Sequence, residues 1–235
     1  MQMDIAGNRY KYPVSNGELK RRLEEVQWAM VRDGVDCLLT HTHSPIFDRG
    51  IRYFIDQQAG GYSTALLIPA KGQMVLLMHG NDCDSLPIPP WGRNVEKIIT
   101  KPYCQPFPFT DTMAGEVIAK EIKERGFRKV GLFCRQCMSL AFGDALRTSL
   151  PEVEFVDFSA AVDRISAVKS TEEWELIIKS IRAHDQLMAA VPALIRPGKM
   201  EFEVRSAIEK LALDMGCDTI GNVAVGSAPK GEPCM

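Results

Sequence analysis

Two histidines and an aspartate lie close enough in the sequence to suggest a metal site. His41 and His43 are alternate residues just after the apolar segment 36–40, and Asp48 follows in the same polar turn. Alternate residues of an extended chain point to one side, and zinc sites often pair histidines with a carboxylate. A further strong ligand is not evident nearby, because His79 is far away in the sequence. We therefore favour the simpler interpretation, in which these are polar loop residues at an interface.

A second pair with possible chemistry is Cys134 and Cys137, which stand between an expected strand at 129–133 and an expected helix at 138–150. A redox dithiol would lie at such a place. Neither a Trp-Cys nor a Pro-Cys context accompanies the pair, so we favour structural thiols that line the turn. The chain has seven cysteines, an odd number at scattered spacing. Without a secretion signal we expect them to be reduced.

His184 is a weaker candidate for a ligand. It lies on the apolar face of an expected helix, between Ile181 and Met188. A hydrogen-bonded histidine at a domain junction is the more common explanation for such a position, and we expect that role here.

The composition excludes several classes of protein. Of 235 residues, 46% are hydrophobic and 25% are charged, which is ordinary for a globular protein and excludes wholesale disorder. The formal net charge is −2 and no basic run is longer than residues 20–22, so nucleic acid is not an expected partner. The longest apolar candidate, 62–78, is interrupted by proline, lysine and glycine, so we expect no membrane span. Residues 1–15 are polar and contain no apolar signal core, and we expect a cytoplasmic protein.

The hydrophobic patterns predict a domain of helices and strands that extends to about residue 162. A helix begins at Asn16 with apolar residues at three- and four-residue steps, and Gly34 ends it. A hairpin with a Pro-Ala-Lys-Gly turn is expected at 62–78. The order of the elements favours a three-layer α/β domain. The other expected elements are strands at 36–40, 51–54, 95–99, 129–133 and 153–156 and helices at 112–125 and 138–150.

A second unit is expected to begin near Ser170. This serine and the glutamate three residues later form a capping box, which begins a helix that Pro-Gly at 197–198 ends. A further helix is expected at 200–215, with Gly216 as its C-terminal cap, followed by a strand at 218–225. The apolar face of the first helix comprises Trp174, Ile177, Ile178, Ile181, Met188 and Val191.

The segment 164–173, Arg-Ile-Ser-Ala-Val-Lys-Ser-Thr-Glu-Glu, resembles the joint between the two domains of creatinases, prolidases and aminopeptidases P. The joint is the most specific sign of this family, because it stands between an α/β domain and two helices. Together with four other similar segments it covers residues 17–225 in the order that the family shows. Those four segments are the opening helix leading into 34–39, the run 51–54, the run 150–157, and 195–204 with its Pro-Gly.

The resemblance implies an α/β N-terminal domain with a mixed sheet at 16–162, followed by a truncated pita-bread (α+β) domain at 168–235. In the family, two divalent metal ions are held by two aspartates, one histidine and two glutamates, and all five positions lie beyond Met235. The resemblance therefore implies no catalytic residue, no metal ligand and no cofactor in this chain. We expect Met235 to be an artificial end, because the two helices after residue 170 would lack most of the sheet that covers them.

A catalytic histidine of the family lies in a loop after the first strand of the second domain. The segment 223–227 resembles the strand and the start of that loop, but residues 228–235 contain no histidine. Either the histidine follows Met235, or Cys234 or Met235 stands in its place.

The resemblance also suggests substrate contacts and a partner. In creatinase-like enzymes the N-terminal domain of one subunit reaches over the active site of its dimer mate. Arg52 and Tyr62 are the residues here whose cation and phenol suit a substrate carboxylate, although exposed strand residues without such a role are the favoured alternative. We expect a homodimer and, in the complete enzyme, a small peptide or guanidino-type substrate.

The function implied by the resemblance is that of the N-terminal portion of a metal-dependent C–N bond hydrolase similar to Xaa-Pro peptidases and creatinase. The chain would contribute dimerisation and contacts to the substrate site. One alternative is a non-catalytic interaction or oligomerisation domain. A less favoured alternative is a thiol-redox protein that uses Cys134 and Cys137.

Overall fold

The computed structural model describes residues 10–44, 49–59, 62–103, 112–218 and 223–226. The contacts within the chain divide it into two compact units. Residues 14–168 belong to the first unit, and residues 10–13 join the residues from Lys169 onward in the second.

A seven-stranded mixed sheet organises the first unit, with the strand order β4-β5-β3-β2-β1-β6-β7. β1, β3, β5, β6 and β7 run in one direction, and β2 and β4 run in the other. The carboxyl ends of five strands therefore meet at one edge of the sheet, which we call the carboxyl edge. The strands are β1 (Cys37–Thr42), β2 (Thr64–Pro69), β3 (Met74–His79), β4 (Cys83–Leu86), β5 (Val95–Lys101), β6 (Lys129–Phe133) and β7 (Glu154–Asp157).

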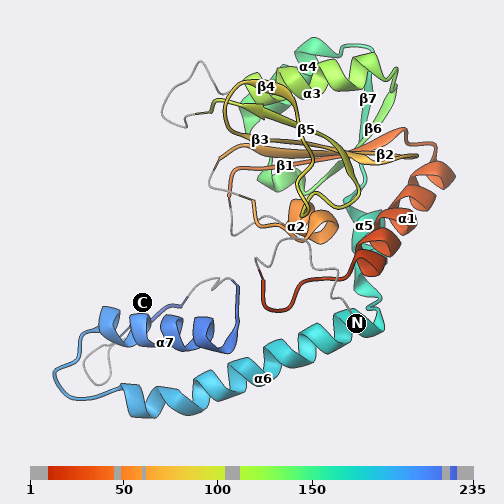
Figure 1. Ribbon diagram of the computed structural model, residues 1–235. Helices are drawn as coiled ribbons and strands as arrows, with labels where there is room; N and C mark the ends of the chain where they lie inside the picture. Colours follow the sequence, from red (N-terminus) through yellow and green to blue (C-terminus); the bar gives the residue numbers. More distant parts are fainter. Residues whose placement is uncertain (1–9, 45–48, 60–61, 104–111, 219–222, 227–235) are drawn as a thin grey trace. The chain divides into compact units, whose positions relative to one another are not determined.

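Helices cover both faces of this sheet (Figure 1). α1 (Asn16–Asp33), α2 (Arg49–Ile55) and α5 (Ser159–Ala167) lie on one face. α3 (Met113–Glu124) and α4 (Leu140–Ser149) lie on the other, and a short 3-10 turn at Arg135–Cys137 precedes α4. This arrangement confirms the predicted three-layer α/β domain with a mixed sheet.

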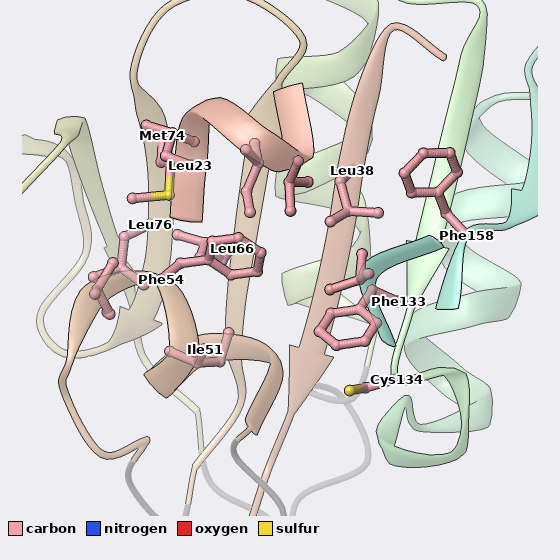
Figure 2. Close-up of a cluster of buried hydrophobic side chains, with 14 of the residues drawn as sticks. Leu23, Leu38, Ile51, Phe54, Leu66, Met74, Leu76, Phe133, Cys134 and Phe158 are labelled. Carbon is pink, nitrogen blue, oxygen red and sulfur yellow. The ribbon is translucent and has the colours of Figure 1, made fainter. Parts of the chain in front are cut away.

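The core consists of one apolar cluster on each face of the sheet. In β1, Leu38 joins the cluster beneath α1, α2 and α5, whereas Cys37 and Leu39 join the cluster beneath α3 and α4. Figure 2 shows the first cluster, in which Phe54 of α2 lies among side chains from the strands. Because both faces are covered, every residue of β1 and β2 is buried. The apolar residues of such a strand run consecutively rather than in alternation, as they do at 65–68 in β2.

The prediction of a strand at 51–54 is wrong, because this segment lies within α2. The buried residues of α2 are Gly50, Ile51, Phe54 and Ile55, and these recur one helical turn apart rather than in alternation. A short apolar run does not distinguish a buried strand from a buried helix by its periodicity. Arg52 therefore lies on a helix and not on a strand edge.

The other elements of the first unit follow the sequence pattern closely. The hairpin of β2 and β3 is confirmed, as are α1, α3, β6, α4 and β7 within a few residues. Ser15 caps α1 by accepting the N–H of Glu18, and Gly34 ends the helix with a φ of 65°. β4 and α5 were not predicted. β4 is a short, largely exposed edge strand, and its polar sequence carries no apolar alternation.

The second unit contains α6 (Thr171–Leu194) and α7 (Glu201–Met215), which pack together. The predicted capping box is confirmed: Ser170 accepts the N–H of Glu173, whose carboxylate accepts the N–H of Ser170. Gly216 ends α7 with a φ of 97°, as expected. Of the strand predicted at 218–225, residues 219–222 lie outside the described part of the chain, and residues 223–225 have no strand structure.

The apolar face predicted for α6 is largely exposed in the structure. Trp174 and Ile181 are each 54% exposed, and Ile178 and Met188 are exposed as well. His184 is also exposed, and its expected role as a hydrogen-bonded histidine at a domain junction stays a prediction. Within the described ranges, none of the helices combines the length and apolar character needed to cross a bilayer.

Candidate functional site

Polar and aromatic side chains collect at the carboxyl edge of the sheet. His41 and His43 lie at the end of β1, His79 ends β3, and Tyr62 and Ser63 lead into β2 at the same edge. Three of the four histidines of the chain are therefore at this edge. In open α/β sheets, ligands bind outside the carboxyl ends of the strands, which makes this edge the candidate site.

His41 is a buried strand residue and not the loop residue that we expected. Its Nε2 lies 2.8 Å from Oγ of Ser63, and its ring stacks on Phe142 of α4 with the centroids 4.0 Å apart. The side chain is only 2% exposed. Burial, together with a smaller effect of the neighbouring His43, lowers the pKa of His41 to about 3. His41 is therefore a neutral hydrogen-bonding group at physiological pH.

Tyr62 and His79 form an aromatic pair at the surface of the carboxyl edge. Their rings stack with centroids 4.2 Å apart, and Tyr62 is 46% exposed. Nδ1 of His79 accepts the backbone N–H of Tyr103 at 3.1 Å, so in the neutral ring the proton lies on Nε2. The pair presents a planar surface with a phenol and an imidazole N–H, and both groups can hydrogen-bond a polar ligand.

Arg52 belongs to a different cluster, at the end of α2. Its backbone carbonyl accepts the N–H of Asp56 at 2.9 Å, and its charge acts on the Asp56 carboxylate. Asp56 is buried, and its Oδ2 accepts the N–H of Val14 at 2.9 Å and a guanidinium N–H of Arg93 at 3.0 Å. Burial raises the pKa of Asp56, although the bonds from Val14 and Arg93 act in the opposite direction. Arg52 and Tyr62 therefore belong to two separate clusters, one at each end of the connection between α2 and β2. Arg52 lies beside Asp56, and Tyr62 stacks on His79.

The candidate metal site at His41 and His43 is not assembled by the described residues. The two rings lie 6.4 Å apart between centroids, and Nε2 of His41 is engaged with Ser63. Asp48 lies outside the described part of the chain. Across that part, no three His, Cys, Asp or Glu side chains are grouped so that they could hold a metal ion.

Cys134 follows β6 directly, and its side chain is part of the hydrophobic core. It has a φ of 55° and is buried, and its sulfur accepts the N–H of Gly50. Burial raises the pKa of Cys134 to about 11 and also raises the pKa of Cys137. Reactive dithiols require a lowered thiol pKa, so burial and the raised pKa values favour the structural interpretation of this pair.

Two members of the carboxyl edge, Ser63 and His79, were missed at the level of sequence. Both flank the predicted hairpin, and the register Ala65–Leu77 places them opposite each other at its open end. The pairing of residues across the predicted hairpin would have been enough to place Ser63 and His79 side by side. The burial of Asp56 has no comparable signal, because its partners Val14 and Arg93 are distant in the sequence.

Comparison with known proteins places this fold among related enzymes. The chain is 26% identical over 203 residues to creatinase from Bacillus sp. (strain B-0618), and the match covers 84% of this chain and 45% of that protein. The structure is similar to X-Pro aminopeptidase from Thermotoga maritima, with a TM-score of 0.63 at 16% identity over 83% of this chain and 49% of that one. The Xaa-Pro dipeptidase from Bacillus anthracis gives a TM-score of 0.57 at 19% identity over 84% and 50%. The chain thus spans about half the length of these relatives.

The strongest assignment concerns the first unit. The profile of the creatinase/prolidase N-terminal domain matches residues 22–168. These residues include the whole sheet, the part of α1 from Arg22 onward and the other helices on both faces of the sheet. The chain therefore belongs to the creatinase/prolidase N-terminal domain family.

Proposed function

We propose that this chain is the N-terminal portion of a metal-dependent hydrolase that cleaves a C–N bond in an Xaa-Pro peptide or a creatine-like substrate. The observation that carries the proposal is the match to creatinase, which extends over 203 residues and is therefore longer than the stretch 14–168 of the first unit. The similarity of the fold to Xaa-Pro peptidases supports the same class of reaction. Among the described residues no three His, Cys, Asp or Glu side chains are grouped so that they could hold a metal ion, and the metal dependence is proposed from the family resemblance alone.

The role proposed for this chain is to dimerise and to supply substrate contacts through Arg52 and Tyr62. Both residues flank the connection from α2 to β2, which ends at the carboxyl edge. Tyr62 is accessible, and its ring stacks on His79. Arg52 is half-buried on α2, and a partly desolvated guanidinium binds a carboxylate more strongly than an exposed one.

Steady-state kinetics of the enzyme that contains this chain, with an Xaa-Pro dipeptide and with creatine, test the proposal. Arg52→Ala and Tyr62→Phe should each lower kcat/KM, Arg52→Ala by about 10- to 100-fold, because a hydrogen bond to a charged group contributes about 1.5–3 kcal/mol. Lys71→Ala, in the exposed turn between β2 and β3, is the control and should leave kcat/KM unchanged. An enzyme that hydrolyses these substrates equally well with both substitutions would exclude the proposed substrate contacts.

A non-catalytic interaction domain is the second candidate, and the exposed apolar residues of α6 favour it. Trp174, Ile178, Ile181 and Met188 are all exposed, which is more apolar side chain than a helix normally leaves in water. The two candidates differ in one measurement. An interaction domain would bind a partner without any hydrolysis of C–N bonds by the protein that contains it.

A further inference from the structure

One face of α1 carries an acid, an indole and a base at regular spacing. Glu24, Trp28 and Arg32 are four residues apart, so they form one stripe along the helix. All three side chains are exposed, and Trp28 is 67% exposed. They line one side of a groove of about 580 Å³ between α1 and α5, whose other side includes Arg164 and Ile165. An exposed tryptophan in a groove flanked by charges is typical of an interaction surface.

The order of charges in this stripe is complementary to itself. Because a helix rises about 1.5 Å per residue, Glu24 and Arg32 lie roughly 6 Å on either side of Trp28 along the axis. A two-fold axis through Trp28 would place a second α1 antiparallel to the first. Glu24 of each copy would then face Arg32 of the other copy, and the two indoles would meet at the axis. Such an isologous contact requires a single surface patch on each copy.

The ion pairs that Glu24 and Arg32 make within the chain are exposed, so both side chains can pair with a second copy instead. Glu24 lies 3.6 Å from Lys20, and both side chains are more than 60% exposed. Arg32 pairs with the adjacent Asp33 at 2.7 Å, and its guanidinium lies 5.4 Å from the centroid of the Trp28 ring. Exposed ion pairs of this kind contribute little to stability. A second copy that excludes water from the stripe would make the same charges interact more strongly.

We infer that the α1 stripe, Glu24–Trp28–Arg32, together with the groove beside it, is a contact between two copies of this chain. The inference rests on the proposed function, because it names the surface through which the proposed dimer forms. The occupant is a second copy, since a partner of uniform charge would meet like charge at one end of the stripe. Arg164 adds a second cation at the Arg32 end of the groove.

A charge-swap experiment on the whole chain tests the inference by analytical ultracentrifugation. Glu24→Arg and Arg32→Glu should each raise the dimer Kd at least tenfold, because each places like charges together twice in the dimer. The double variant with both substitutions should return the Kd to within about threefold of the original, because the swapped charges pair again. Trp28→Ala should raise the Kd at least tenfold, and added salt should weaken the unsubstituted dimer.

The control is Lys120→Glu on α3, an exposed lysine that faces Glu124 one turn away as Lys20 faces Glu24. It should leave the Kd unchanged, and circular dichroism should show all variants folded. If the chain forms a dimer and the α1 substitutions do not change its Kd, the inference is wrong. The proposed hydrolase function and the proposed dimer would not be affected by that result. A double variant weaker than both single ones, or a chain that stays monomeric at all concentrations, would also overturn the inference. Loss of the proposed function would appear separately, in the kinetics of Arg52→Ala and Tyr62→Phe.

Discussion

His41 and Ser63 form a buried hydrogen bond, with 2.8 Å between Nε2 and Oγ, that links β1 to the residue before β2. The bond lies at the carboxyl edge of the sheet, beneath α4, where the His41 ring stacks on Phe142. Nδ1 of His41 is buried and has no hydrogen-bond partner among the described residues. A charged imidazole here would lack both water and an anionic neighbour, which is the physical reason for its low pKa.

The first prediction is that His41 makes the stability of the protein depend on pH. Its pKa is about 3 in the folded state against about 6.5 in the unfolded state. Between these values the unfolded chain binds more protons, so the free energy of unfolding should rise with pH by about 1.4 kcal/mol per unit and level off above about 6.5. Urea unfolding at pH 4.5 to 7.5 measures this slope.

His41→Gln should flatten the slope, because glutamine can still reach Ser63 but does not titrate in this range. His184→Asn, at the exposed histidine of α6, is the control and should leave the slope unchanged. Equal slopes in the original chain and in His41→Gln would show that another group causes the pH dependence.

The second prediction concerns the buried ion pair of Asp56 and Arg93. The two side chains are 7% and 10% exposed, respectively, so removing the carboxylate leaves a buried cation without its partner. Asp56→Ala should lower the free energy of unfolding by about 3–5 kcal/mol. Asp56→Asn should cost less, because the amide oxygen can still accept the N–H of Val14 and asparagine tolerates the φ of 51°.

The matched control for the ion pair is Arg128 with Glu152, which are separated by a similar 2.9 Å but are 70% and 79% exposed. Arg128→Ala should change the free energy of unfolding by less than about 0.5 kcal/mol. Chemical denaturation of the three variants gives the comparison. If Asp56→Ala costs no more than Arg128→Ala, the buried pair does not stabilise the fold.

The third prediction is that Gly50 tolerates no side chain. A Cβ at this position would lie 2.1 Å from Oγ1 of Thr40 and 3.4 Å from Sγ of Cys134. Gly50→Ala should therefore lower the free energy of unfolding by at least about 1–3 kcal/mol, the usual cost of overpacking a core.

Gly143 in α4 offers the opposite case, because a Cβ there would meet only a side-chain nitrogen of Arg147 at 3.7 Å. Gly143→Ala should raise the free energy of unfolding by roughly 0.5–1 kcal/mol through helix propensity. Thermal unfolding of both variants tests the pair of predictions. A Gly50→Ala protein as stable as the original would mean that α2 can move away from β1 without cost.

The fourth prediction is that Cys134 and Cys137 are structural. The double variant with serine at both positions should lose about 0.5–3 kcal/mol of stability, as core changes usually do, and should keep any dimerisation. Because burial raises the pKa of both thiols, they should react slowly with a disulfide reagent at pH 8. A strongly acidic thiolate at either position would instead support the redox alternative.

The sequence by itself determined most of the elements of the fold. Patterns that span only a few residues predicted the Ser170 capping box, the end of α1 at Gly34 and the hairpin of β2 and β3. Each of these features is stabilised by local hydrogen bonds or backbone conformation, which neighbouring residues dictate. The family was also recognisable from the sequence, because the resemblance depends mainly on one short run of residues, the segment 164–173.

Only the tertiary structure decided which side chains are buried together. The run 51–54 became a helix because Phe54 and Ile55 pack on the sheet beneath α1, a contact that no local pattern expresses. His41 lost its charge because α4, about one hundred residues later in the chain, covers it with Phe142. Asp56 gained its partners from Val14 and Arg93 in the same way. Burial and pKa depend on the dielectric surroundings that distant segments create, and a linear sequence does not specify these until the chain has folded.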